Sequence, residues 1–266
     1  MNHINFSALN VSIEDLLHKP TLLFDDKNGH QIYWLGINEE TAFRCNTYLI
    51  VDNEEAFIVD PGSRMYFEFV KQRVLDIIPL KQLKGMILCH QDPDVAGSSI
   101  DWLELNPKLL VVSSDRTNVL LPHYGIKDYD FYSIGLENNF RYQFSSGHIL
   151  QFIEAPFLHF PGAFTIFDKE SQFLLSGDIW AALDIDWKLV IDDFDSHTMK
   201  LDLFHLDYMA SNVAARGFAM KIQDMKIEAI LPQHGSIIPK KFVVDAIKYL
   251  EELQCGLDIV YPELSN

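Results

Sequence analysis

The feature that most constrains this chain is an apolar run that ends abruptly in three potential metal ligands. Residues 86–89 (MILC) are typical of a buried strand, and His90, Asp92 and Asp94 follow at alternate positions. A turn at a strand end can direct all three side chains at one point, and Pro93 stiffens that turn because its ring fixes φ. Asp94 alone is compatible with an ordinary helix N-cap. The three together indicate a functional site.

Three later strand ends carry similar residues. His159, Asp178 and His234 each come shortly after an apolar run that predicts a strand. Any one of them alone is more often a surface residue or a satisfied polar residue than a ligand. Functional sites on α/β scaffolds gather where loops converge at strand ends. Four such ends, each with a histidine or an aspartate, therefore favour one shared site.

The remaining pattern predicts strands, then helices, then strands, then helices. Strands are predicted at 46–51, 56–59, 86–89, 109–112, 150–153, 163–167, 172–175 and 229–231, and helices at 66–78, 95–105, 203–222 and 242–253. This order suits two sheets in a sandwich with helices outside. Periodicity alone does not choose that arrangement over another α/β fold.

Composition excludes several classes of protein. With 38 acidic and 21 basic residues the net charge is −17, which disfavours nucleic acid and anionic membranes as partners. No stretch approaches the roughly 18 apolar residues of a membrane helix. The three cysteines have no CxxC spacing, and residues 1–10 do not resemble a secretory signal, so we expect a cytoplasmic protein. Because no linker or repeat divides residues 1–266, we expect a single domain.

The ligand pattern resembles that of the metallo-β-lactamase superfamily, His-x-[His/Glu/Asp]-x-Asp-His followed by His, Asp and His. The resemblance covers about residue 30 to residue 240 and implies an αββα sandwich. Within the superfamily, the chain looks most like the flavodiiron group, which has a carboxylate at the second position. The segments 46–50 (NTYLI), 158–162 (LHFPG) and 232–235 (PQHG) are also similar to that group.

Two departures separate the chain from flavodiiron proteins. Those proteins carry a flavodoxin-like FMN domain after this one, whereas this chain stops at Asn266, so no fused FMN is expected. The residue after Asp94 would normally be a histidine ligand, and here it is Val95, which cannot bind a metal. With this shortened ligand set, the chain resembles stand-alone oxygen-binding di-iron proteins.

The resemblance implies a particular pair of metal positions. The first metal would be held by His90, Asp92, His159 and Asp178. The second would be held by Asp94, Asp178 and His234, with Asp178 bridging. Three carboxylates and three imidazoles favour iron, with manganese and zinc as alternatives. Val95 and Trp180 are expected to line the ligand pocket, although a tryptophan at such a place is more often simply core.

Several functions remain open. The preferred one is a di-iron protein that binds or senses dioxygen and signals through a partner protein. The alternatives are an oxygen or nitric oxide reductase with a separate electron donor, and a dinuclear zinc hydrolase with a metal-bound hydroxide as nucleophile. Asp92 and Val95 weigh against the hydrolase, and six intact ligands weigh against a scaffold that has lost its metal. Because the related reductases are dimers, a homodimer is plausible.

Overall fold

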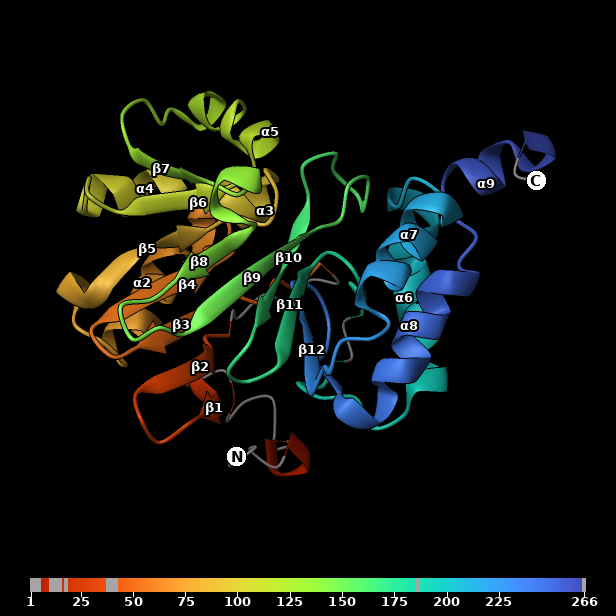
Figure 1. The fold of residues 1–266 in the computed structure, drawn as a ribbon, viewed down its shortest axis with the longest axis horizontal. Coiled ribbons are helices and arrows are strands. Elements are labelled where there is room, and N and C mark those ends of the chain that lie inside the picture. The colour runs from red at the N-terminus through yellow and green to blue at the C-terminus, as the bar shows by residue number, and fades with distance from the viewer. Residues whose placement is uncertain (1–5, 10–15, 17–18, 37–42, 185–186, 265–266) are drawn as a thin grey trace.

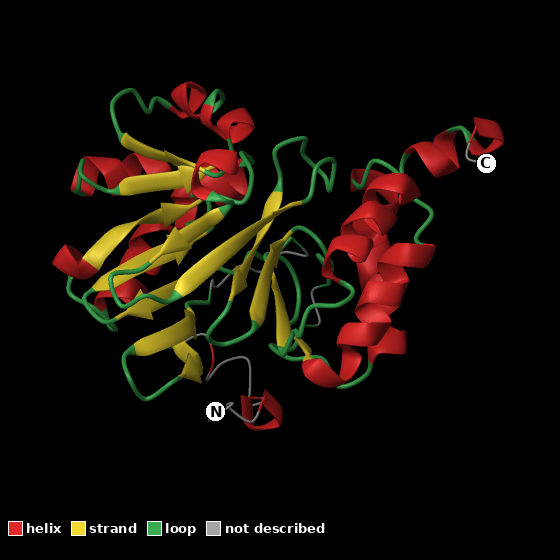
Figure 2. Ribbon diagram, viewed as in Figure 1, coloured by secondary structure: helices red, strands yellow, loops and turns green. Residues whose placement is uncertain are grey.

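Two β-sheets packed face to face, with helices on both outer faces, form the architecture of the chain (Figure 1, Figure 2). The computed structural model describes residues 6–9, 16, 19–36, 43–184 and 187–264. Of the first ten residues, only Phe6–Leu9 are described, and they form a short 3-10 helix. Within the described residues, no helix combines the length and the apolar character needed to cross a membrane.

The first sheet has seven strands that follow one another in chain order. They are β1 (Thr21–Asp25), β2 (His30–Trp34), β3 (Tyr48–Asp52), β4 (Glu55–Val59), β5 (Leu83–Ile87), β6 (Leu110–Ser113) and β7 (Asp130–Ser133). The β1–β4 strands pair antiparallel, as expected for hairpins, whereas β4 to β7 pair parallel. Parallel neighbours need crossover connections, and these connections carry the helices of this half.

The second sheet has six strands in the order β13-β12-β11-β10-β9-β8. They are β8 (Arg141–Gln143), β9 (Ile149–Glu154), β10 (Phe164–Asp168), β11 (Phe173–Gly177), β12 (Ala229–Pro232) and β13 (Ile238–Pro239). Only β11 and β12 pair parallel; the other neighbours are antiparallel. Both β11 and β12 therefore end at the same edge of the sheet.

The helices lie outside the two sheets, and α6, α7 and α8 stand together beside the second sheet (Figure 1). The α-helices that lie wholly within the described residues are α2 (Phe67–Leu75), α3 (Pro93–Ala96), α4 (Ser99–Leu105), α5 (Asp115–Asn118), α6 (Phe194–Tyr208), α7 (Asn212–Ile222), α8 (Val243–Glu252) and α9 (Leu257–Val260).

Alternation along the strands divides the core into three layers. In β11, Phe173 and Leu175 point into the layer between the sheets, whereas Leu174 points towards α6, α7 and α8. A third apolar layer packs the first sheet against α2, α3 and α4, with Val70 and Trp102 among its buried side chains. Strands buried on both faces explain why these segments are almost continuously apolar. The predicted αββα sandwich is confirmed.

Two predicted helices are wrong in extent. The segment 95–105 forms two helices, α3 and α4, because the chain turns at Gly97 and Ser98 between them. The segment 203–222 is also divided, since Met209 and Ser211 are both extended, with ψ of 143° and 165°. The apolar spacing continues through this break, so periodicity alone predicts one helix where the backbone forms two.

A buried ionic cluster connects the two sheets at one end of the sandwich. His30 Nδ1 of the first sheet lies 2.7 Å from Asp52 Oδ2, and its Nε2 lies 3.2 Å from Asp168 Oδ1 of the second sheet. His148, just before β9, places Nδ1 2.5 Å from the same Asp52 oxygen. His30, Asp52 and Asp168 are each at most 1% exposed. We call these four residues the ionic cluster.

Candidate metal centre

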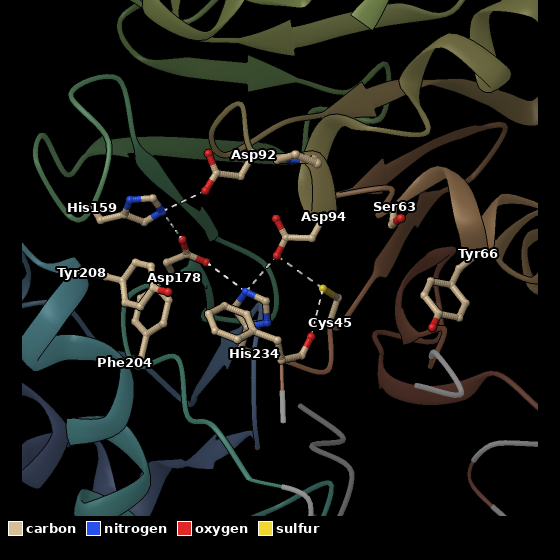
Figure 3. A pocket seen from close by; sticks show the side chains of 12 residues that line it. Cys45, Ser63, Tyr66, Asp92, Asp94, His159, Asp178, Phe204, Tyr208 and His234 are labelled. Atoms are coloured by element: carbon tan, nitrogen blue, oxygen red, sulfur yellow. Dashed lines mark hydrogen bonds and ion pairs between the residues drawn. The ribbon is translucent and has the colours of Figure 1, made fainter. Parts of the chain in front are cut away.

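All six predicted ligands meet at the other end of the sandwich. His90 follows β5, Asp178 follows β11 directly, and His234 follows β12. Asp92 and Asp94 lie at the start of α3, and His159 lies in the loop between β9 and β10. Figure 3 shows four of the carboxylate and imidazole groups, those of Asp92, Asp94, His159 and His234, arranged around Asp178. The ends of β5, β11 and β12, the start of α3 and the loop between β9 and β10 therefore meet at one place, as the sequence predicts.

Asp178 lies at the centre of the group. Its Oδ2 is 3.1 Å from His90 Nε2 and 2.9 Å from His159 Nε2. Its Oδ1 faces the opposite side, 3.6 Å from His234 Nε2, and has no hydrogen-bond partner although the residue is only 5% exposed. One carboxylate therefore faces two separate clusters of donor atoms.

The other two carboxylates divide in the same way. Asp92 Oδ2 is 3.2 Å from His159 Nε2, and Asp94 Oδ2 is 3.2 Å from His234 Nε2. The N-cap of α3 is Asp92, and its side chain makes no capping hydrogen bond. The possibility that Asp94 is merely an N-cap is therefore wrong. Both carboxylates point at imidazoles and not at the helix end.

The charges in the site are strongly coupled. Burial lowers the pKa of His90, but Asp178 and Asp92 more than offset this effect and raise that pKa to about 9. The pKa of His159 rises to about 10, because its hydrogen bonds to the same two carboxylates outweigh burial. Burial raises the pKa of Asp178, whereas the neighbouring imidazoles bring it well below its ordinary value. A cation that binds these groups would therefore displace protons from the imidazoles.

The donor set fits a pair of divalent cations. The Nε2 atoms of three imidazoles and the oxygens of three carboxylates converge, and Asp178 Oδ1 is buried without a hydrogen bond. An unsatisfied buried oxygen needs a positive partner. Imidazole with carboxylate suits iron, zinc or manganese. The other ring nitrogen of His234, Nδ1, lies 3.2 Å from Arg44 O, a contact typical of a metal-binding histidine.

A pocket of about 410 Å³ opens onto these groups. Its walls include Phe43, Phe204 and Tyr208, and the last two rings stack with centroids 4.7 Å apart on α6. Phe43 lies edge-on to His234 at 5.0 Å, and Tyr208 lies edge-on to His159 at 6.0 Å. The aromatic wall limits the access of water to one side of the site. Sequence reasoning missed these residues, and only the i, i+4 spacing on α6 hinted at a shared face.

Neither residue that was expected to line the pocket does so. Val95 is fully buried in the layer between the first sheet and its helices. Trp180 is fully buried on the other side, where its Nε1 donates to Ala246 O at 2.8 Å. The expectation for both therefore needs correction. Val95 stands where the family pattern has a histidine, but its side chain does not line the pocket. Trp180 is a core residue, as is commoner for that residue type.

One cysteine that sequence reasoning left unassigned lies in the pocket. Cys45 Sγ is 3.5 Å from Asp94 Oδ2 and 3.9 Å from Gln233 Nε2. The other two cysteines, Cys89 and Cys255, are buried elsewhere, and no pair of the three forms a disulfide. Cys89 packs in the layer between the sheets.

Comparison with known proteins places this architecture in a family. The model of the family described as "ODP family beta lactamase" matches residues 43–235, which contain all six predicted ligands. The chain belongs to the ODP family. The metallo-β-lactamase-type resemblance of the sequence is thereby confirmed.

Solved ODP structures are similar along almost the whole chain. The structure described as the peroxy diiron species of chemotaxis sensor ODP has a TM-score of 0.81 at 28% identity, covering 91% of this chain and 99% of that one. The apo state of chemotaxis sensor ODP from T. denticola has a TM-score of 0.78, also at 28% identity, covering 92% and 98%. Iron and chemotaxis are properties that these descriptions give to those proteins.

Diflavin flavoproteins are also similar in sequence. Diflavin flavoprotein A 1 of Synechocystis sp. is 25% identical over 213 residues, which are 76% of this chain and 35% of that protein. The chain spans about a third of the length of the curated relatives it matches. This similarity agrees with the flavodiiron-like pattern of the sequence.

Proposed function

We propose that this chain binds two iron ions and dioxygen, and that it acts as an oxygen-binding sensor. The observation that carries the proposal is the arrangement around Asp178, whose two oxygens face separate clusters of imidazole and carboxylate donors. The chain's similarity over 91% of its length to a protein described as a di-iron chemotaxis sensor supports iron as the metal. A bound pair of ferrous ions would supply the electrons and open positions that dioxygen needs.

The chain's own residues would hold and shield the metal pair. His90, Asp92 and His159 would bind the first ion and Asp94 and His234 the second, with Asp178 between them. The aromatic wall of Phe43, Phe204 and Tyr208 would keep bulk water from one side of the site. Excluding water limits the supply of protons to a bound ligand, which favours binding over reduction.

The proposal includes a protein partner that reads the state of the site. The relative described as a chemotaxis sensor motivates a signalling partner. A single domain, a homodimer and a cytoplasmic location are parts of the same proposal.

The test is a spectrum of the protein purified without oxygen. We expect about two irons per chain, no colour in the reduced state, and a lasting charge-transfer band after air is admitted. The matched variants are His234→Ala, which removes a proposed ligand, and His123→Ala, which removes an exposed histidine outside the site. His234→Ala should lose the band and His123→Ala should keep it. Zinc in place of iron, with no spectral change, would contradict the proposal and favour a hydrolase.

A reductase is the second candidate, favoured by the similarity to diflavin flavoproteins. The same experiment separates the two functions. A reductase would bleach quickly to an oxidised state and would turn over repeatedly when a reductant is added. A sensor would retain its band over many minutes.

A further inference from the structure

Cys45 is held rigidly beside the second cluster of ligands. It forms an isolated antiparallel bridge with His234, and the amide of the next residue, Asn46, donates to Gln233 O at 2.5 Å. Asn46 Nδ2 also donates to Pro232 O at 2.9 Å. These bonds hold the residues just before β3 against the residues at the end of β12. Cys45 is 2% exposed and still lines the pocket, so its thiol points inwards.

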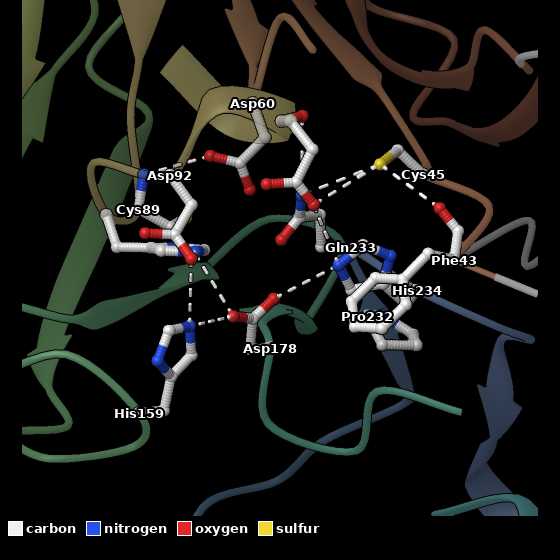
Figure 4. Close-up of polar contacts among 12 residues, drawn as sticks. Phe43, Cys45, Asp60, Cys89, Asp92, His159, Asp178, Pro232, Gln233 and His234 are labelled. Carbon is white, nitrogen blue, oxygen red and sulfur yellow. Dashed lines mark hydrogen bonds and ion pairs between the residues drawn. The ribbon is translucent and has the colours of Figure 1, made fainter. Parts of the chain in front are cut away.

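The thiol shares its surroundings with two proposed ligands. Cys45 Sγ, an Asp94 carboxylate oxygen and a His234 ring nitrogen all lie within 4.8 Å of one another, as do the donor atoms of His90, His159 and Asp178. Figure 4 shows Cys45 on the His234 side of the site, away from His159. Two of these groups of three therefore lie side by side, with Asp92 next to His159, and each group corresponds to one of the two proposed metal positions.

A second observation points to a cation in the group that contains Cys45. Asp178 Oδ1 is buried, has no hydrogen-bond partner, and faces His234 Nε2 at 3.6 Å. With Cys45, the donors around this space become a thiol sulfur, two carboxylates and an imidazole. A cysteine, a histidine and carboxylates in fourfold coordination are usual for zinc and related divalent ions.

We propose that Cys45 Sγ is the fourth protein ligand of the second metal position, together with Asp94, Asp178 and His234. This inference rests on the proposed two-metal site and supplies the donor that Val95 lacks. In the metal-free chain the S–H group donates to Asp94 Oδ2 at 3.5 Å. When a divalent ion binds, a sulfur–metal bond forms, the S–H bond breaks and the proton leaves to solvent; no electron is transferred.

The charge of the loaded site supports this assignment. Three carboxylates carry three negative charges, whereas two divalent ions carry four positive charges. A Cys45 thiolate makes the two totals equal, and an uncompensated charge is unfavourable in a site where Asp178 is 5% exposed and His234 1% exposed. A thiolate also selects for iron, cobalt or zinc over manganese and magnesium at this position.

Cobalt binding tests the inference without relying on oxygen chemistry. Metal-free protein is titrated with Co²⁺ under anaerobic conditions, and the near-ultraviolet thiolate-to-cobalt charge-transfer band is recorded. We expect two Co²⁺ per chain and the band in the unmutated protein. Cys45→Ser should lose the band and bind one of the two ions roughly 10-fold or more weakly. Cys255→Ser is the matched control, since Cys255 is equally buried but lies outside the pocket, and it should keep both properties.

X-ray absorption of the zinc-loaded, unmutated protein guards against a variant that does not fold. The expected result is one sulfur ligand at about 2.3 Å on one of the two zincs, which is an average of about half a sulfur per zinc. Two bound metals with no sulfur signal and no charge-transfer band would overturn the role of Cys45 and leave the two-metal site intact. Failure of the unmutated chain to bind two metals would instead overturn the proposed function.

Discussion

The ionic cluster makes a quantitative prediction about stability. His30 lies between Asp52 and Asp168, all three at most 1% exposed, so its imidazolium balances two buried carboxylates. Replacing it in His30→Leu removes the ion pair with Asp168 and leaves Asp52 with His148 alone. Breaking a buried ion pair by removing one partner costs about 3–5 kcal/mol. We therefore expect a loss of that size in the free energy of unfolding at pH 6.

The pH dependence follows from the pKa of His30. Burial lowers this pKa, but Asp168 and Asp52 outweigh burial and raise it from 6.5 to about 9. At about 1.4 kcal/mol per pH unit, the difference corresponds to about 3 kcal/mol. Because the folded value is the higher one, this stabilisation is complete below pH 6.5 and is lost as the pH rises through about 9. Burial raises the pKa of Asp52, but its contacts with His30 and His148 outweigh burial and bring that pKa below its ordinary value. The contribution of Asp52 to stability is therefore lost only in acid.

Urea unfolding of the metal-free protein at pH 6 and pH 10 measures both effects. The difference between the unmutated chain and His30→Leu should be about 3–5 kcal/mol at pH 6 and should shrink by about 3 kcal/mol at pH 10. Histidines of the metal site titrate in both proteins, so they cancel in this difference. His123→Leu, at an exposed position, should change stability by less than about 0.5 kcal/mol. An equal difference at both pH values would refute the charged state of His30.

Four further substitutions, one of them a control, test other parts of the structure. Asp178→Asn should reduce metal content from two ions per chain towards none, as measured by elemental analysis, because an amide cannot bridge two cations. Gly85→Ala should lower the free energy of unfolding in urea by about 1–3 kcal/mol, since the new Cβ would lie 2.2 Å from a backbone oxygen of β6. Gly217→Ala is the control: the new Cβ has open space around α7, so this substitution should leave stability unchanged or raise it. Trp180→Phe should lower stability by about 1–3 kcal/mol, because the carbonyl of Ala246 loses its donor, and a thermal melt equal to that of the unmutated chain would contradict this.

The convergence of the proposed ligands was predictable because strand ends carry most of them. His90, Asp178 and His234 each follow an apolar run closely, and such runs identify strands without long-range information. Asp92 and Asp94 come from the same segment as His90, so one turn places three donors. The order of the elements suited a layered sandwich, and the resemblance of the ligand pattern was needed to choose that sandwich over another α/β fold.

The rest of the site depends on contacts that no local pattern encodes. Cys45 lies 49 positions before Asp94 and precedes a strand, so neither motif nor periodicity connects the two residues. Phe204 and Tyr208 reach the pocket only because α6 packs beside the second sheet. Val95 follows Asp94 directly, yet the helix turns its side chain into the core.

The two ends of the sandwich are closed by different chemistry. Just before β3, Cys45 faces His234, which follows β12 of the other sheet. At the end of β3, Asp52 contacts His30 and His148, and His30 in turn contacts Asp168. The proposed ligands also come from both sheets, so a bound metal pair would link the sheets at one end, while the ionic cluster links them at the other end whether or not metal is bound.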